Sequence, residues 1–72
     1  METSETVSIV VNGEAKQAPH GATVRQLLEI LGLDAGRVAI ERNLEILARS
    51  EWSVTRLVAG DRYEIVQFVG GG

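Results

Sequence analysis

The segment TVRQLLEILGL, residues 23–33, constrains the fold most, because it predicts a single short helix between segments that alternate like strands. Thr23 is a good N-cap, and Gln26 three residues later completes a capping box. Gly32 fits the position that ends a helix. Four apolar residues fall at spacings i, i+3, i+4 and i+7 and form one face: Val24, Leu27, Leu28 and Leu31. This face must pack against other elements of the chain.

A β-hairpin is predicted before the helix. Val7, Ile9 and Val11 fall at every second position, as in a half-buried strand. The Asn12-Gly13 pair that follows is typical of a tight hairpin turn, because both residues tolerate positive φ. The second strand is expected over residues 14–18 and ends at the turn of residues 19–21.

Three more strands are predicted after the helix. A third strand is expected over residues 37–41, a turn at residues 42–43 and a short fourth strand over residues 45–48. Residues 50–58 fit neither period, so we expect an irregular segment held by Trp52 and Leu57. After a turn at residues 59–61, the last strand covers residues 62–69, with Tyr63 and Ile65 on its inner face.

This order of elements predicts an α+β fold, a mixed sheet of four to five strands with one main helix packed on one face. The last strand must find an open position in the sheet, and the simplest one is beside the first strand and parallel to it. That is the β-grasp, or ubiquitin-like, arrangement. We expect one domain over residues 1–72, with a frayed start at residues 1–5 and a flexible tail at residues 69–72.

Composition excludes several classes of function. The 72 residues contain no cysteine, and the one histidine, His20, cannot hold a metal alone. A net charge of -3 argues against nucleic-acid binding, and no apolar run is long enough to span a membrane. We find no catalytic constellation, and we expect the scattered acidic residues to be solvated, with Asp61 serving a turn. These features fit a cytoplasmic protein that is a monomer when free.

The outer face of the last strand is a candidate docking site. Val66 and Phe68 point away from the helix in this prediction, and we expect Val10 of the first strand to lie near them. An uncovered apolar patch rimmed by charge often marks a docking site. The strand runs directly into the glycines of the chain's end, and we include Gly70 with this docking set.

The terminal glycines are the other candidate. Gly70, Gly71 and Gly72 lack Cβ atoms, so they could enter a narrow channel. The carboxyl of Gly72 would be ionised and a poor electrophile, so chemistry there requires activation by a partner, for example with ATP. The alternative from the residues alone is a frayed end without function.

Four segments in this order resemble the sulfur carrier family of thiamine biosynthesis (ThiS): VNGE, GATVRQLLEILGL, VAIERNLEILAR followed by Trp52, and AGDRYEIVQFVGGG. The resemblance covers residues 7–72. The family usually has Asp-Gly-Asp before the last strand, where this chain has Ala59-Gly60-Asp61. The difference lies in a turn and leaves the terminal glycines unchanged.

The resemblance implies a β-grasp fold and a carrier, not an enzyme. A ubiquitin-activating-like adenylyltransferase would use ATP and Mg²⁺ to adenylate Gly72, and the chain itself would bind no cofactor. Sulfur from cysteine, delivered through a cysteine desulfurase, would leave a thiocarboxylate that thiazole synthase consumes. The family's terminal pair corresponds to Gly71 and Gly72, and docking corresponds to Val66 and Phe68.

Three alternatives remain open. The chain could be a sulfur carrier for another pathway, such as the small subunit of molybdopterin synthase. It could be a ubiquitin-like modifier that is joined to lysines, or a binding module with an inert tail.

Overall fold

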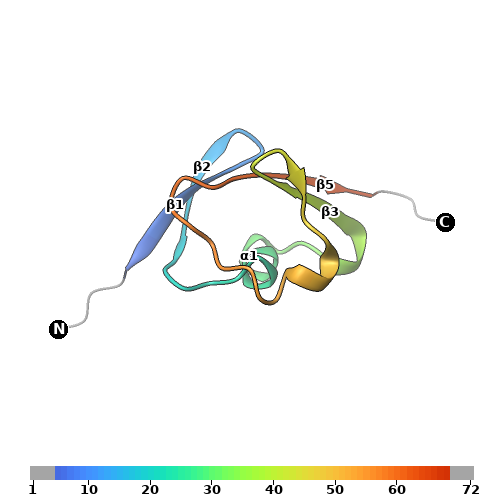
Figure 1. Cartoon of the computed structure of the whole chain (residues 1–72), viewed down its shortest axis with the longest axis horizontal. Coiled ribbons are helices and arrows are strands. Elements are labelled where there is room, and N and C mark those ends of the chain that lie inside the picture. The colour runs from blue at the N-terminus through green and yellow to red at the C-terminus, as the bar shows by residue number, and fades with distance from the viewer. Residues whose placement is uncertain (1–4, 69–72) are drawn as a thin grey trace.

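The computed structural model describes residues 5–68, which form a five-stranded mixed sheet with one helix against one face (Figure 1). The elements follow one another along the chain: β1 (Thr6–Val11), β2 (Glu14–Pro19), α1 (Val24–Leu31), β3 (Val38–Arg42), β4 (Glu45–Ile46) and β5 (Arg62–Gln67). Two short 3₁₀ helices, Ala35–Arg37 and Arg49–Glu51, precede β3 and follow β4. The expectations for residues 1–4 and 69–72 lie outside the described residues, whereas Glu5 accepts a backbone hydrogen bond from His20.

The strand order is β2-β1-β5-β3-β4. Strand β5 pairs parallel with β1 and antiparallel with β3, so the last strand occupies the centre of the sheet. This confirms the predicted position beside the first strand. Because β5 is central, its inward side chains fall in the middle of the core.

The helix begins and ends where its capping residues predict. Thr23 Oγ1 accepts from the backbone N–H of Gln26 at 3.2 Å, and Gln26 Oε1 accepts from the backbone N–H of Thr23 at 2.9 Å. Gly32 ends α1 with a φ of 72°, which places it in the left-handed region that glycine tolerates. The face that α1 buries against the sheet contains Val24, Leu27 and Leu28.

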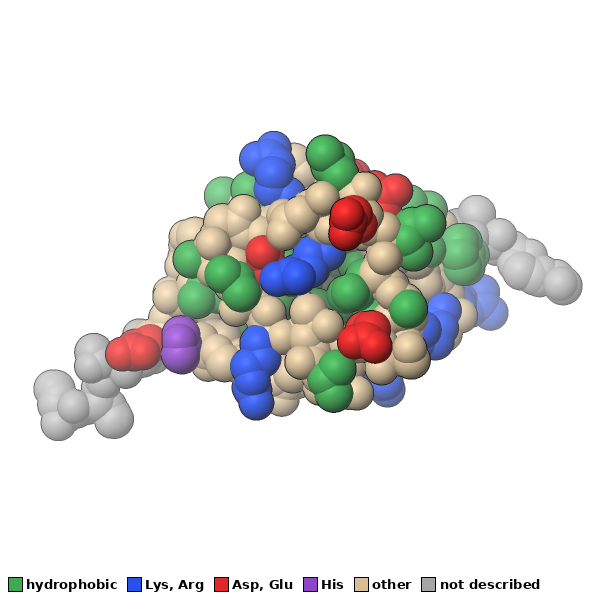
Figure 2. Space-filling view, viewed as in Figure 1, with side chains coloured by type: hydrophobic (Ala, Val, Ile, Leu, Met, Phe, Trp, Pro, Cys, Tyr) green, Lys and Arg blue, Asp and Glu red, His purple; other side chains and the backbone are tan. Residues whose placement is uncertain are grey.

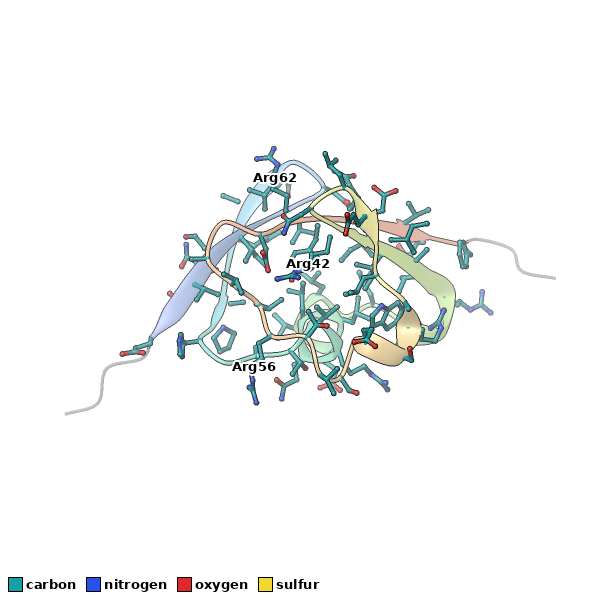
Figure 3. The ribbon with its side chains drawn as sticks, viewed as in Figure 1. Arg42, Arg56 and Arg62 are labelled. Atoms are coloured by element: carbon teal, nitrogen blue, oxygen red, sulfur yellow. The ribbon has the colours of Figure 1, made fainter. Side chains whose placement is uncertain are left out.

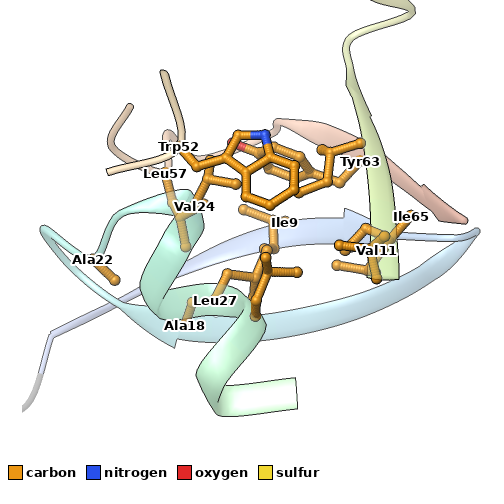
Figure 4. Close-up of a cluster of buried hydrophobic side chains, with 13 residues drawn as sticks. Ile9, Val11, Ala18, Ala22, Val24, Leu27, Trp52, Leu57, Tyr63 and Ile65 are labelled. Carbon is orange, nitrogen blue, oxygen red and sulfur yellow. The ribbon is translucent and has the colours of Figure 1, made fainter. Parts of the chain in front are cut away.

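One hydrophobic core lies between α1 and the sheet (Figure 4). Tyr63 and Ile65 of β5 belong to it, with Ile9 and Val11 of β1. Trp52 and Leu57 close the core from the irregular segment, as predicted. The indole N–H of Trp52 donates to the Leu47 carbonyl at 3.1 Å, so the buried ring keeps its polar group satisfied.

The β3–β4 hairpin differs from the prediction by one residue. Arg42 pairs with Glu45, so the turn consists of Asn43 and Leu44 instead of Arg42 and Asn43. Strand β4 is only Glu45–Ile46, because Leu47 turns in toward the core and the chain enters a 3₁₀ helix two residues later. Trp52 follows this 3₁₀ helix directly and is buried.

No helix within residues 5–68 is long and apolar enough to cross a bilayer.

Candidate functional site

The outer face of β5 carries exposed apolar side chains, as the alternation predicts. Tyr63 and Ile65 are buried, whereas Val66 and Phe68 are 58% and 52% exposed. The backbone N–H of Phe68 donates to the Arg37 carbonyl at 2.7 Å, so pairing with the β3 side continues to this residue. The chain therefore leaves the sheet at Phe68 with an apolar side chain on the face away from α1.

Val10 does not join these residues, and this part of the prediction is wrong. The parallel register places Val10 opposite Arg62, four residues before Val66 on β5. Four strand residues span about 13 Å, so Val10 lies well short of the Val66 end. The reason is that β1 turns away at Asn12-Gly13 while β5 continues.

Residues of β3 and β4 take the place expected for Val10. Ala39 of β3 pairs with Val66, and Ile46 of β4 pairs with Glu41, which places all of them on the outer face. A hollow of about 370 Å³ lies over this face, and its lining consists of Ala39, Ile40, Glu41, Ile46, Glu64 and Val66. In the space-filling view, hydrophobic and acidic side chains lie beside one another at the upper right, where Figure 1 shows β3 and β5 (Figure 2).

The sequence carried a signal for these residues. VAIER alternates, so Ala39 and Glu41 belong to the face opposite the buried Val38 and Ile40. The one-residue error in the turn hid Ile46, because a side chain's face depends on register.

Asn12 holds the free side of β5 where β1 has ended. Its side-chain amide donates to the Ile65 carbonyl at 3.1 Å, and its Oδ1 accepts from the Ile65 N–H at 2.7 Å. One side chain thus replaces a strand's backbone at this position. This contact fixes the second half of β5, which carries Val66.

Asp61, the residue before β5, is only 5% exposed, which corrects the expectation that this turn residue is solvated. Its carboxylate accepts hydrogen bonds from five donors: the Tyr63 hydroxyl, the Val58 backbone N–H, the Asn43 amide and the Nε and Nη2 of Arg42. Arg42 points from β3 toward the segment that precedes β5 (Figure 3).

This network sets the pKa values of its members. Burial alone would raise the pKa of Asp61, but its hydrogen bonds outweigh burial and hold the pKa below its usual range. Burial and the adjacent Asp61 carboxylate raise the pKa of the Tyr63 hydroxyl, so it remains a donor. Burial alone would lower the pKa of Arg42, but the Asp61 carboxylate raises it. The network is structural, and it fixes the start of β5.

The terminal residues Gly70, Gly71 and Gly72 lie outside the described residues. Four residues follow Phe68 in the sequence, so the Gly72 carboxylate is at most about 14 Å from Phe68. Within residues 5–68, no group of three or more His, Asp or Glu side chains is arranged to hold a metal ion.

Comparison with known proteins agrees with the fold. A solved structure of a thiamine biosynthesis protein (ThiS) from Geobacter metallireducens superposes with a TM-score of 0.78, at 32% identity, over 92% of this chain and 100% of that one. The sulfur carrier protein ThiS of Escherichia coli is 32% identical over 66 residues, which are 92% of this chain and 100% of that protein.

A longer relative matches the same region. A thiazole synthase of Paramagnetospirillum magneticum is 44% identical over 66 residues, which are 92% of this chain but only 20% of that protein. The chain therefore spans about a fifth of the length of this relative. The profile of the ThiS family matches residues 7–72, and this chain belongs to the ThiS family.

Proposed function

We propose that this chain is a sulfur carrier of thiamine biosynthesis that holds sulfur as a thiocarboxylate on Gly72. The observation that carries the proposal is the family match, which runs from residue 7 to residue 72 and so includes Gly71 and Gly72. As a member of a carrier family the chain is a substrate of partner enzymes and not a catalyst. We place it in the cytoplasm, as a monomer when free.

Activation comes first in this scheme. A ubiquitin-activating-like adenylyltransferase joins the Gly72 carboxylate to the AMP portion of ATP, with Mg²⁺, and pyrophosphate leaves. A sulfur nucleophile derived from cysteine through a desulfurase then displaces AMP. Because the chain has no cysteine, the terminal acyl group is where it can hold transferable sulfur. ATP and Mg²⁺ belong to the activating partner.

Thiazole synthase is the proposed acceptor of the sulfur. Two relatives that contain a segment similar to this chain are themselves named thiazole synthase. Joining a carrier segment to its enzyme in one chain raises their effective concentration without any new contact. That arrangement supports thiazole synthase as the enzyme that this carrier serves.

Val66 and Phe68 are proposed to dock the partners. Both side chains are more than half exposed and lie where the chain leaves the sheet. Because Gly72 is within about 14 Å of Phe68, an enzyme that acts on Gly72 must approach this end of β5.

The test is the intact mass of the chain after incubation with ATP, Mg²⁺, the adenylyltransferase and a sulfur donor. We expect replacement of one oxygen by one sulfur, localised to Gly72 by fragmentation. Adding thiazole synthase and its other substrates should return the carboxylate. An unchanged mass with partners that load a control carrier would contradict the proposal.

The same assay separates the alternatives. A loaded chain that donates sulfur only to the large subunit of molybdopterin synthase would assign it to that pathway. A conjugate on a target lysine would identify a ubiquitin-like modifier, and binding without modification would identify a binding module.

A further inference from the structure

Leu44 adopts a backbone conformation that its side chain disfavours. Its φ is 74°, in the left-handed region, where a bulky residue other than glycine is an outlier. The other tight hairpin turn of this chain has nearly the same angles, with φ of 51° at Asn12 and 84° at Gly13. The β3–β4 turn has φ of 51° at Asn43, so Leu44 stands where the first hairpin has glycine.

Packing does not compensate for this strain. The Leu44 side chain is 89% exposed, and Ile46, two residues later, is 82% exposed. A polar residue or glycine at either position would be compatible with the fold. Strained residues persist at functional sites more often than elsewhere, so this outlier points to a function of the turn.

A second unfavourable feature lies beside the same hairpin. Glu41 of β3 is directly opposite Glu64 of β5, and like charges at opposite positions in a sheet repel. Neither carboxylate takes part in the ion pairs found among residues 5–68. Both line the hollow, whose other lining side chains are apolar. The free chain gains nothing from this pair, whereas a cation bound between the two carboxylates would remove the repulsion.

We propose that the outer sheet surface is the docking site for a partner protein. This surface consists of Ala39, Glu41, Ile46, Glu64, Val66 and Phe68, with Leu44 at the β3–β4 turn. That protein presents an apolar side chain to the hollow and an arginine or lysine to Glu41 and Glu64. The proposal rests on the proposed function, because the partner is an enzyme that acts on Gly72.

Charge and position both argue for this occupant. The hollow combines apolar walls with two carboxylates, and a guanidinium pairs with carboxylates in charge-assisted hydrogen bonds. Phe68 belongs to the surface and lies four residues before Gly72. An enzyme that reaches the terminal carboxylate therefore covers the Phe68 end of this surface. Arg42 pairs with Tyr63, five residues before Phe68, so the contact must extend about 17 Å along β5 to include Ile46 and Leu44 at the β3–β4 turn.

The test compares stability with binding in Leu44→Gly and Leu44→Asn. Both substituents suit a positive φ, so the melting temperature should rise. Affinity for the purified adenylyltransferase or thiazole synthase, measured by calorimetry, should fall about tenfold, as expected for loss of a buried apolar contact. A more stable but weaker-binding chain distinguishes a docking residue from a structural one.

The charge component is tested with Glu41→Gln and Glu64→Gln. Each change removes the repulsion, so stability should hold or increase. Each should also weaken binding and reduce its dependence on salt, because an ion pair with the partner is lost. Val54→Ser is the control, because Val54 is 69% exposed but lies in the segment that contacts the start of α1.

Unchanged affinity for both enzymes in the Leu44 and glutamate variants would overturn the inference. Equal weakening by Val54→Ser would also overturn it, because the effect would not be specific to the surface. The loading of sulfur on Gly72 is read separately by intact mass. Loss of binding in these variants therefore supports the docking role of the surface even if no thiocarboxylate forms. Normal loading of sulfur with unchanged binding rejects the docking role and leaves the proposed carrier function standing.

Discussion

The phenolic hydroxyl of Tyr63 donates a 2.9 Å hydrogen bond to Asp61 Oδ2, and both side chains are buried at the start of the central strand. Arg42 of β3 reaches the same carboxylate, with its Nε 3.2 Å from Oδ2. The contact joins β5, β3 and the turn before β5 through one charged group. The buried side chains among residues 5–68 leave no polar atom without a partner.

Replacing Asp61 with asparagine should destabilise the fold. The substitution keeps the size of the side chain but removes the charge that pairs with Arg42 and one of the two acceptor oxygens. Breaking a buried pair by removing one partner costs about 3–5 kcal/mol, and we expect about 2–3 here because the Arg42 side chain is partly exposed. Urea unfolding measures the change.

Glu29→Gln is the control for this substitution, because Glu29 is an exposed residue of α1. It should leave the free energy of unfolding within about 0.5 kcal/mol of the wild type. An Asp61→Asn protein as stable as this control would show that the network contributes nothing net.

Stability should fall in acid because of the same carboxylate. The pKa of Asp61 is lowered on folding, so its contribution is complete above the unfolded value near 4 and is lost as the pH falls through the lower folded value. The free energy of unfolding, measured from pH 7 to pH 2, should decrease below about pH 4. The free energy of unfolding of Asp61→Asn should decrease less steeply over this range. An identical pH dependence in both proteins would show that other carboxylates cause the loss of stability in acid.

The helix and the inner face of the sheet could be predicted from the sequence because their signals are local. Thr23, Gln26 and Gly32 fix the ends of α1 with contacts three or four residues apart. Strand alternation similarly identified Tyr63 and Ile65 as core residues. Asp61 was missed because its burial depends on Arg42 and Asn43, which are distant in sequence and arrive only when β3 pairs with β5.

Gly32→Ala tests one of these local signals. The φ of 72° disfavours alanine, and no atom lies within 4 Å of an added Cβ, so the backbone alone decides the effect. We expect a loss of about 1 kcal/mol, which lowers the melting temperature by about 4–8 °C in a domain of this size. Gly36→Ala is the control, because Gly36 has no positive φ, and it should change the melting temperature much less. An equal drop in melting temperature in both variants would show that packing around the added methyl group, and not the positive φ of Gly32, causes the loss.

The docking residues were only partly predictable, and the reason is register. Val66 and Phe68 follow from the alternation of their own strand. Val10 required the offset between β1 and β5, and Ile46 required the position of the β3–β4 turn. Neither strand register can be read from composition or from hydrophobic periodicity, because each depends on which pairing of the two strands buries the core side chains best.

Phe68→Asp should weaken binding to the adenylyltransferase. Phe68 is 52% exposed at the end of β5, and the substitution places a charge in an apolar contact. Calorimetry should show a loss of about tenfold or more, typical for an aromatic anchor. Val54→Asp is the matched control at an exposed apolar residue outside the surface, and it should bind normally. Full affinity in Phe68→Asp would remove this residue from the docking surface.

Removing Gly71 and Gly72 should abolish sulfur loading without affecting the fold. The core residues all lie between Ile9 and Ile65, so the truncated chain keeps every buried side chain of the described range. We therefore expect a free energy of unfolding within about 0.5 kcal/mol of the wild type and no thiocarboxylate by intact mass. A chain that instead lacks residues 1–4 retains the terminal carboxylate and should load normally. Sulfur incorporation by the chain without Gly71 and Gly72 would show that the carrier chemistry does not depend on these two glycines, because the new terminus would be serving in their place.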